Sequence, residues 1–186
     1  MRNMLSAMPR ALLLIDIQRD YFPGGEMPLP GSEAAAEAAA RLLSGFRARG
    51  EPVIHVQHIW DEPDAQYMRP GTPGAEHDPR VAPAPGERLV TKESPNAFIG
   101  TDLEAQLREL DAQELVVAGM MTSMCVDATV RAAVDLGFAV TVAGDACAAP
   151  DLRHGETTVT AEQVHAAFLA ALADGYADVV EAAALA

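Results

Sequence analysis

The feature that most constrains the fold is a regular alternation of short apolar runs with longer helical segments. The runs are too short for buried helices, and their near-continuous apolar character is typical of parallel strands covered on both faces. The expected strands are RALLLIDIQ (10–18), PVIHVQHIW (52–60), RLVTKES (88–94), ELVVAGM (114–120), FAVTVAGDAC (138–147) and YADVVEA (176–182). The expected helices cover 32–50, 101–110, 125–137 and 160–175.

Strands that alternate with helices imply right-handed crossovers and a mostly parallel sheet. At 186 residues the chain suits one domain with a substantial core, and two domains would be cramped. We therefore predict a single α/β domain over residues 1–186. Its architecture would be a Rossmann-like three-layer αβα sandwich of about six strands, wound in two directions from a switch point.

Local signals suggest where two of the helices begin. Ser32 would cap the first helix and Gly50 would end it. Thr101, with Glu104 three residues later, forms a capping-box pattern at the start of the second helix.

The charge balance limits the partners that the chain can bind. Thirteen Lys and Arg residues stand against 27 Asp and Glu residues, which gives a formal net charge of −14. Such a surface repels nucleic acid and anionic membranes, so we expect neither as a partner. A small-molecule substrate fits better, and an anionic one is not excluded, because one well-placed Lys or Arg can reverse the local potential.

The sequence gives little support for export or for a membrane location. No apolar run approaches the roughly 18 residues that span a bilayer. The run ALLLI (11–15) is too short for a signal-peptide core and is better explained as the first strand. Cys125 and Cys147 are the only cysteines, too few for a small secreted protein held by disulfides. We therefore expect a cytoplasmic protein with free thiols, and a packing role for Cys147.

Three reactive side chains lie near the ends of expected strands: Asp16, Lys92 and Cys125. Parallel strands would bring them to one edge of the sheet, where ligands bind in such folds. A thiol at a helix N-terminus has its thiolate stabilised by backbone N–H groups, and a nearby ammonium lowers its pKa further. A carboxylate can take the thiol proton, and the same N–H groups can receive an oxyanion. This combination suits attack on an acyl carbon.

The helix that follows Cys125 indicates which way the thiol points. Asp127, Arg131 and Asp135 are spaced four apart and would form a charged stripe that faces solvent. Cys125 precedes Asp127 by two positions, about 200° around the helix axis, so it would face the sheet.

Three segments carry a resemblance to a known family: LLLIDIQRDYFPGG (12–25), VTKESPNAFIGTDL (90–103) and VVAGMMTSMCVDATVRAAVDLGFAVTVAGDACA (116–148). In order and spacing they resemble the three motif blocks of the isochorismatase-like cysteine hydrolases. That superfamily also contains nicotinamidases, N-carbamoylsarcosine amidases and streptothricin hydrolase. The similarity extends over nearly the whole chain and implies the isochorismatase-like hydrolase fold. Members of the family are commonly homo-oligomers, so a dimer or tetramer is implied here.

The resemblance also implies roles for individual residues. Asp16 would act as general base and acid, Lys92 as its electrostatic partner and Cys125 as the nucleophile. A cis peptide would join Met120 to Met121, and the backbone amides of Met121 and Cys125 would form the oxyanion hole.

The resemblance favours hydrolysis of a C–N bond through a thioester, in a small amide, lactam or ureide. True isochorismatases cleave a vinyl ether and can dispense with the cysteine, which this chain retains. Two alternatives stay open. One is vinyl-ether hydrolysis with Asp16 as the acid, and the other is a non-catalytic binding protein or a redox sensor of the same fold.

One departure from the nicotinamidases concerns the metal. Those enzymes carry an aspartate and closely spaced histidines after the second strand, where this chain has HVQHIWDEPD (55–64). His55 and His58 are three apart, so on a strand they point to opposite faces. We therefore expect no metal and no other cofactor, and nicotinamide is disfavoured as the substrate.

Residues near the strand ends are candidates for the substrate pocket. Gln18 would orient Asp16, line the pocket or bond to a loop. Tyr21, Phe22 and Trp60 would form an apolar wall, although packing is equally compatible with each of them. The long loop 60–87, dense in Pro, Gly and charge, would set the size of the pocket.

Overall fold

The structure is a computed structural model that describes residues 8–186. Its centre is a six-stranded sheet in the order β3-β2-β1-β4-β5-β8, in which every neighbouring pair is parallel. The strands are β1 (Arg10–Ile15), β2 (Val53–His58), β3 (Arg88–Lys92), β4 (Glu114–Met120), β5 (Ala139–Ala148) and β8 (Asp178–Val180). The order reverses between β1 and β4, which is the predicted switch point.

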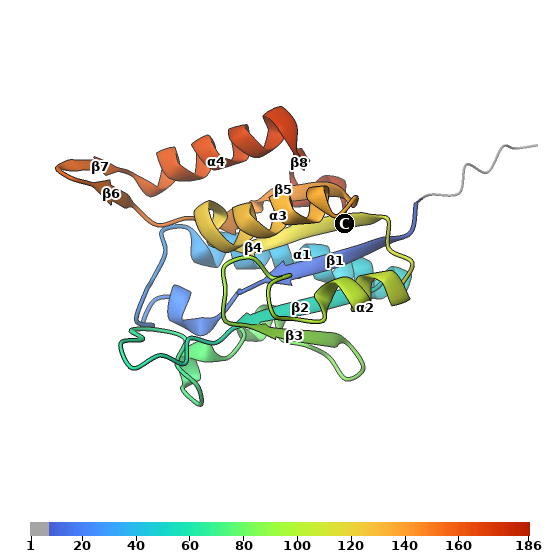
Figure 1. Cartoon of the computed structure of the whole chain (residues 1–186), viewed down its shortest axis with the longest axis horizontal. Helices are drawn as coiled ribbons and strands as arrows, with labels where there is room; N and C mark the ends of the chain where they lie inside the picture. Colours follow the sequence, from blue (N-terminus) through green and yellow to red (C-terminus); the bar gives the residue numbers. More distant parts are fainter. Residues whose placement is uncertain (1–7) are drawn as a thin grey trace, which may run out of the picture.

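Helices cover both faces of this sheet (Figure 1). They are α1 (Ser32–Arg49), α2 (Leu103–Glu109), α3 (Asp127–Asp135) and α4 (Ala161–Gly175). The core on one side of the sheet is built with α1, and the core on the other side with α2, α3 and α4. The predicted three-layer α/β sandwich is confirmed for the described residues, and the first seven residues of the predicted domain lie outside them.

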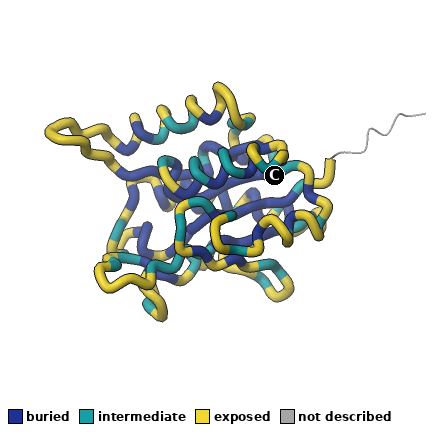
Figure 2. Tube along the Cα trace, in the orientation of Figure 1, coloured by how far each residue is buried: buried dark blue, intermediate teal, exposed yellow. Residues whose placement is uncertain are grey.

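The two cores explain the continuous apolar runs in the sequence. Successive strand residues point to opposite faces, and in β1 Leu12 and Leu14 pack in the core under α1. Leu13 and Ile15 pack in the other core. All four are at most 1% exposed. Figure 2 shows the central strands buried and the outer helix surfaces exposed.

Both predicted helix starts need correction. The first helix begins at Ser32, but its N-cap is Gly31, whose φ of 77° is readily adopted by glycine; the serine side chain makes no cap bond. The second helix begins at Leu103 without a capping box, and its N-cap is Asp102. The Thr101 hydroxyl instead donates to the Ala97 carbonyl and accepts from the Leu103 amide.

Several short elements were not expected. A two-stranded antiparallel hairpin, β6 (Leu152–His154) with β7 (Thr157–Val159), projects from the body of the protein (Figures 1 and 2). All six of its strand residues are exposed, so no apolar alternation marked it in the sequence. The remaining short elements are 3-10 turns at Arg19–Tyr21, Pro73–Ala75, Pro79–Val81 and Ala182–Ala184, and a π-helical turn at Thr122–Val126. Within residues 8–186, no helix combines the length and apolar character needed to cross a membrane.

Candidate active site

The carboxylate of Asp16 lies where the chain leaves β1. Its backbone has a φ of 50°, in the left-handed region that aspartate tolerates better than most residues. The neighbouring strand β4 comes so close here that a Cβ on Gly119 would collide with the Ile15 carbonyl oxygen. The β1 strand ends at Ile15, which pairs with Gly119 of β4, and the Asp16 side chain that follows is fully buried.

Lys92, the last residue of β3, brings its ammonium to the same point. Its Nζ lies 2.7 Å from Asp16 Oδ2, 3.3 Å from Cys125 Sγ and 3.0 Å from His58 Nδ1. The side chains of Lys92 and Asp16 have no exposure. A lysine ammonium has three N–H donors and no acceptor, so these contacts use its full capacity.

Cys125 completes the group from the π-helical turn that follows β4. The turn comes directly after a cis peptide between Met120 and Met121, at the position that the resemblance implies. Cys125 is 4% exposed. Its Sγ, a carboxylate oxygen of Asp16 and a ring nitrogen of His58 all lie within 4.8 Å of one another. The structure thus brings Asp16, Lys92 and Cys125 together at the carboxyl edge of the sheet.

The protonation state at this edge differs from the expectation. Burial, followed by the Asp16 carboxylate, raises the pKa of the Cys125 thiol, and the Lys92 ammonium offsets this only in part. The predicted lowering of the thiol pKa is therefore wrong, because desolvation and the Asp16 charge outweigh the ammonium. At rest the site holds a neutral thiol beside an Asp16–Lys92 ion pair.

Burial makes the Asp16 carboxylate a stronger base than an exposed one. Desolvation raises the pKa of Asp16, and the charge and hydrogen bond of Lys92 oppose that rise. Burial lowers the pKa of Lys92, but Asp16 and Cys125 raise it by more, so the ammonium stays charged. Neither carboxylate oxygen of Asp16 makes a well-aligned hydrogen bond within residues 8–186, although Lys92 Nζ lies 2.7 Å from Oδ2. A basic oxygen near a neutral thiol is the arrangement that proton abstraction requires.

His58 belongs to this group, and the sequence analysis did not include it. Burial and the Lys92 ammonium lower the pKa of His58 to about 4, so the ring is neutral near pH 7. Since the ammonium can only donate, Nδ1 accepts from Lys92 and Nε2 carries the ring proton. His58 ends β2, so the strand-end argument used for Asp16 and Lys92 would have found it.

The other histidine of β2 faces away from the site. His55 is buried, and its Nε2 lies 2.8 Å from Glu87 Oε2. His55 and His58 thus point to opposite faces, as their spacing predicts. Asp16, His58 and Cys125 are close enough to offer ligands to one metal ion, but Lys92 Nζ contacts all three. A metal cation there would have to displace the ammonium.

A cavity of about 190 Å³ opens above Cys125. Its walls are Tyr21, His58, Trp60, Tyr67, Glu93, Pro95, Met121, Met124 and Cys125. Tyr21 and Trp60 thus lie where the sequence analysis expected a substrate wall. Tyr67, from the long loop, was not anticipated; its ring centroid is 5.4 Å from that of Trp60 and 6.1 Å from that of Tyr21.

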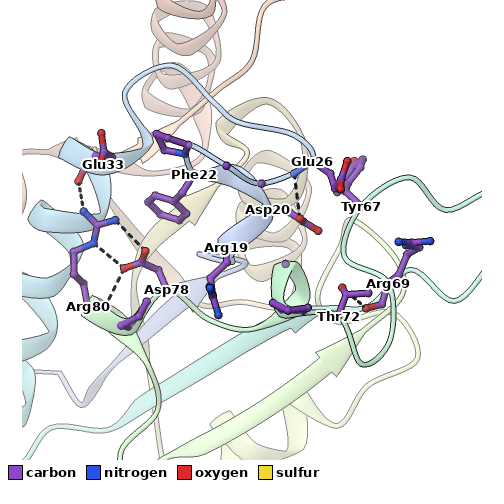
Figure 3. A pocket seen from close by; sticks show the side chains of 16 residues that line it. Arg19, Asp20, Phe22, Glu26, Glu33, Tyr67, Arg69, Thr72, Asp78 and Arg80 are labelled. Atoms are coloured by element: carbon purple, nitrogen blue, oxygen red, sulfur yellow. Dashed lines mark hydrogen bonds and ion pairs between the residues drawn. The ribbon is translucent and has the colours of Figure 1, made fainter.

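Two candidate pocket residues do not line this cavity, and for one of them, Gln18, the structure shows the bond to a loop that was the alternative expectation. Gln18 is buried, and its amide bonds to the backbone of His58 and to the Ala75 carbonyl, so it fastens the loop to β2. Phe22 does not line this cavity either, because its ring lies beneath the Arg80 guanidinium, 5.0 Å from ring centroid to Cζ. It lines a different cavity, which has Tyr67 in common with the first (Figure 3).

Asp20 fixes the path of the long loop. Its carboxylate accepts hydrogen bonds from the Met68 amide at 2.6 Å and the Glu26 amide at 3.2 Å. Gly74 packs so tightly on this carboxylate that there is no room for a Cβ. The Trp60 amide donates to the Met68 carbonyl. These bonds hold Trp60 and Tyr67 over the thiol.

Cys147 behaves as a packed residue. It is 5% exposed, its thiol donates to the Ala143 carbonyl, and burial raises its pKa to about 12. Both cysteines are free. The charged stripe expected on α3 is present in part, as an Asp127–Arg131 ion pair at 2.8 Å.

Comparison with known proteins gives a consistent result. The family model described as "Isochorismatase domain" matches residues 10–184. An uncharacterized isochorismatase family protein of Bacillus subtilis is 50% identical over 172 residues, covering 92% of this chain and 96% of that protein. A maleamate amidohydrolase of Pseudomonas putida is 34% identical, over 69% of this chain and 67% of that enzyme. The crystal structure of a putative isochorismatase hydrolase from Oleispira antarctica superposes with a TM-score of 0.93, at 48% identity and 98% coverage of both chains.

Proposed function

The chain belongs to the isochorismatase family of hydrolases, and we propose that it is a cysteine-dependent enzyme that cleaves a C–N bond. Its substrate would be a small amide, lactam or ureide, and the reaction would pass through a thioester on Cys125.

The observation that carries this proposal is the position of Cys125 Sγ. It lies at the floor of a cavity, 3.3 Å from an ammonium and close to a buried carboxylate whose pKa is raised. A protein that only bound a ligand would gain nothing from burying this charged pair, whose desolvation is costly. The similarity to a protein named maleamate amidohydrolase supports amide chemistry at such a site but does not fix the charge of the substrate.

In the proposed cycle, Asp16 takes the Cys125 proton as Sγ bonds to the carbonyl carbon. Lys92 stabilises the charge on both partners, and the amides of Met121 and Cys125 receive the oxyanion. The C–N bond then breaks as Asp16 returns the proton to nitrogen, which leaves as ammonia or an amine. Water adds to the thioester and gives its proton to Asp16. That proton returns to Sγ as the carboxylic acid departs.

The raised pKa of Asp16 also suits a second reaction, because a protonated carboxyl could act as the acid in vinyl-ether hydrolysis. The two reactions differ in their need for sulfur. Cys125→Ala abolishes amide hydrolysis but leaves part of any vinyl-ether cleavage.

The test is ammonia release from a panel of small amides by the wild-type protein and by Cys125→Ala. We expect the variant to lose at least about 10³-fold in kcat/KM. Cys147→Ala is the matched control, since it removes the other buried thiol and should keep activity. Intact-mass analysis of a quenched reaction should show an acyl adduct on Cys125. Equal activity of Cys125→Ala and the wild type would overturn the proposal.

A further inference from the structure

We propose that the site, if it is the amide hydrolase proposed above, is selective for charge: it accepts uncharged and cationic substrates and rejects those with a carboxylate near the scissile bond. Glu93 at the cavity wall would be the residue that sets this preference.

Within residues 8–186, the cation that contacts the thiol is the Lys92 ammonium, 3.3 Å from Cys125 Sγ. A substrate carboxylate in such a cavity normally needs an arginine or lysine. Lys92 cannot serve, because its three donors are already directed to Asp16, His58 and Cys125. A carboxylate could gain a bond from Lys92 only by breaking one of these contacts, and each involves a group that the chemistry uses or that orients the ammonium.

The cavity walls supply no other positive charge. No arginine and no lysine is among the nine residues that line it. His58 is neutral near pH 7, because its pKa is lowered to about 4. Below the wall, Asp16 and Lys92 cancel each other as an ion pair. Glu93, which is exposed, is therefore the lining residue that leaves net charge on the wall, and that charge is negative.

The rest of the wall suits a cation or a neutral group. Tyr21, Trp60 and Tyr67 present aromatic rings, and a substrate ammonium is attracted to such rings when it lies within about 6 Å of their centroids. Met121 and Met124 add polarizable, uncharged surface. The formal charge of −14 on the whole chain acts in the same direction, because it lowers the local concentration of anions.

One experiment uses three amides of matched length: pentanamide, 5-aminopentanamide and 4-carbamoylbutanoate. We expect kcat/KM to be highest for the ammonium compound and lowest for the carboxylate. Glu93→Gln should reduce the ratio of these two by about five- to tenfold, as expected for loss of one charge in a solvated cavity. Glu93→Lys should bring the ratio near or below one. For each variant, kcat/KM for the two charged amides is divided by its own value for pentanamide, so that a general loss of activity cancels.

Glu156→Gln is the matched control, since it removes the same charge from the exposed turn of the β6–β7 hairpin. It should leave the ratio unchanged. A ratio that falls equally in Glu156→Gln would assign the preference to overall charge and overturn the role of Glu93.

A second readout does not depend on turnover. Alkylation of Cys125 is followed by peptide mass spectrometry with iodoacetate, iodoacetamide and 2-bromoethylamine, and each rate is divided by that for free cysteine. We expect the corrected rate to be lowest for the anionic iodoacetate, with Glu93→Lys raising it selectively. If no amide is hydrolysed but this order holds, the hydrolase proposal fails and the charge preference stands. If amides are hydrolysed and the carboxylate reacts as fast as the ammonium, the charge preference is overturned alone.

Discussion

The two cavities that Tyr67 lines differ in a way that volume does not reveal. The larger, about 760 Å³, is lined with charged residues such as Arg19, Arg80 and Asp78 (Figure 3). Two of its acidic groups are held by hydrogen bonds: Asp78 Oδ1 lies 2.7 Å from Arg80 Nε, and the Asp20 carboxylate accepts from backbone amides. The smaller, about 190 Å³, holds a thiol next to a carboxylate that makes no well-aligned hydrogen bond within residues 8–186.

The reactive groups lie where a buried carboxylate keeps hydrogen-bonding capacity that the described part of the chain does not use. The Arg80–Asp78 ion pair beside the larger cavity is partly exposed, with side-chain exposures of 32% for Arg80 and 8% for Asp78. Its role is structural. The Asp16–Lys92 pair has no exposure and is desolvated at a cost. Three predictions turn this comparison into measurements.

The largest difference in activity and stability should come from neutralising one carboxylate at each cavity, Asp16 at the smaller and Asp78 at the larger. Asp16→Asn cannot accept the thiol proton, so we expect kcat to fall about 10²- to 10⁴-fold. It also leaves Lys92 buried without its counter-charge, at a cost of about 3 kcal/mol in the free energy of unfolding. Asp78→Asn should keep activity within about threefold and cost about 1–2 kcal/mol. Urea unfolding and steady-state kinetics measure both quantities, and similar losses in the two variants would contradict the contrast.

The second prediction concerns pH. Activity requires ionised Asp16, whose pKa burial raises above the ordinary carboxyl value of about 3.9, so activity falls as pH drops through that raised pKa. Burial tends to raise the pKa of Asp78 as well, but the hydrogen bonds and charge of Arg80 lower it overall. The stability that Asp78 contributes is therefore present above about pH 3.9 and is lost only as pH falls through its lower folded pKa.

On acidification, then, catalysis should be lost while the fold persists. Profiles of kcat/KM and of the melting temperature over the same pH series check this order. Loss of both at one pH would mean that the acid limb reports unfolding and not the titration of Asp16.

The smallest expected difference separates the two aromatic walls. Tyr67→Leu removes a ring that contacts Trp60 and Tyr21 above the thiol, so we expect KM to rise about three- to tenfold with kcat little changed. Phe22→Leu changes a ring in the other cavity, beneath Arg80, and should leave KM within about twofold. The two substitutions are matched in kind. An equal rise in KM would place part of the substrate in the larger cavity.

The sequence was sufficient to predict the central sheet and the residues that lie at the ends of its strands. Strand ends located Asp16 and Lys92, and the apolar runs predicted the sheet because β1 is buried on both faces. The same rule applied to β2 would have added His58. Catalytic roles, a homo-oligomer, a cytoplasmic location and the lack of a cofactor stay predictions.

What the sequence could not supply depends on contacts between distant segments. The position of Tyr67 follows from Asp20 bonding to the Met68 amide, 48 residues away, and no local pattern encodes that bond. The sequence could not decide between the wall and packing roles of Phe22 for the same reason, since its partner Arg80 comes from the long loop. The thiol pKa was misjudged because helix position is visible in a sequence and the degree of burial is not.

The close approach of β4 to β1 at Gly119 has a consequence for how the substrate specificity of such an enzyme can be changed. No side chain fits between Gly119 of β4 and the Ile15 carbonyl. The backbone of β4, which leads to Cys125, is therefore held close to that of β1, which leads to Asp16. The spacing between the Asp16 and Cys125 side chains is therefore set by the sheet. The segment that supplies Trp60 and Tyr67 is fastened by a handful of bonds to Gln18 and Asp20. Exchanging that segment would change the wall of the substrate cavity and leave the positions of the catalytic residues unchanged.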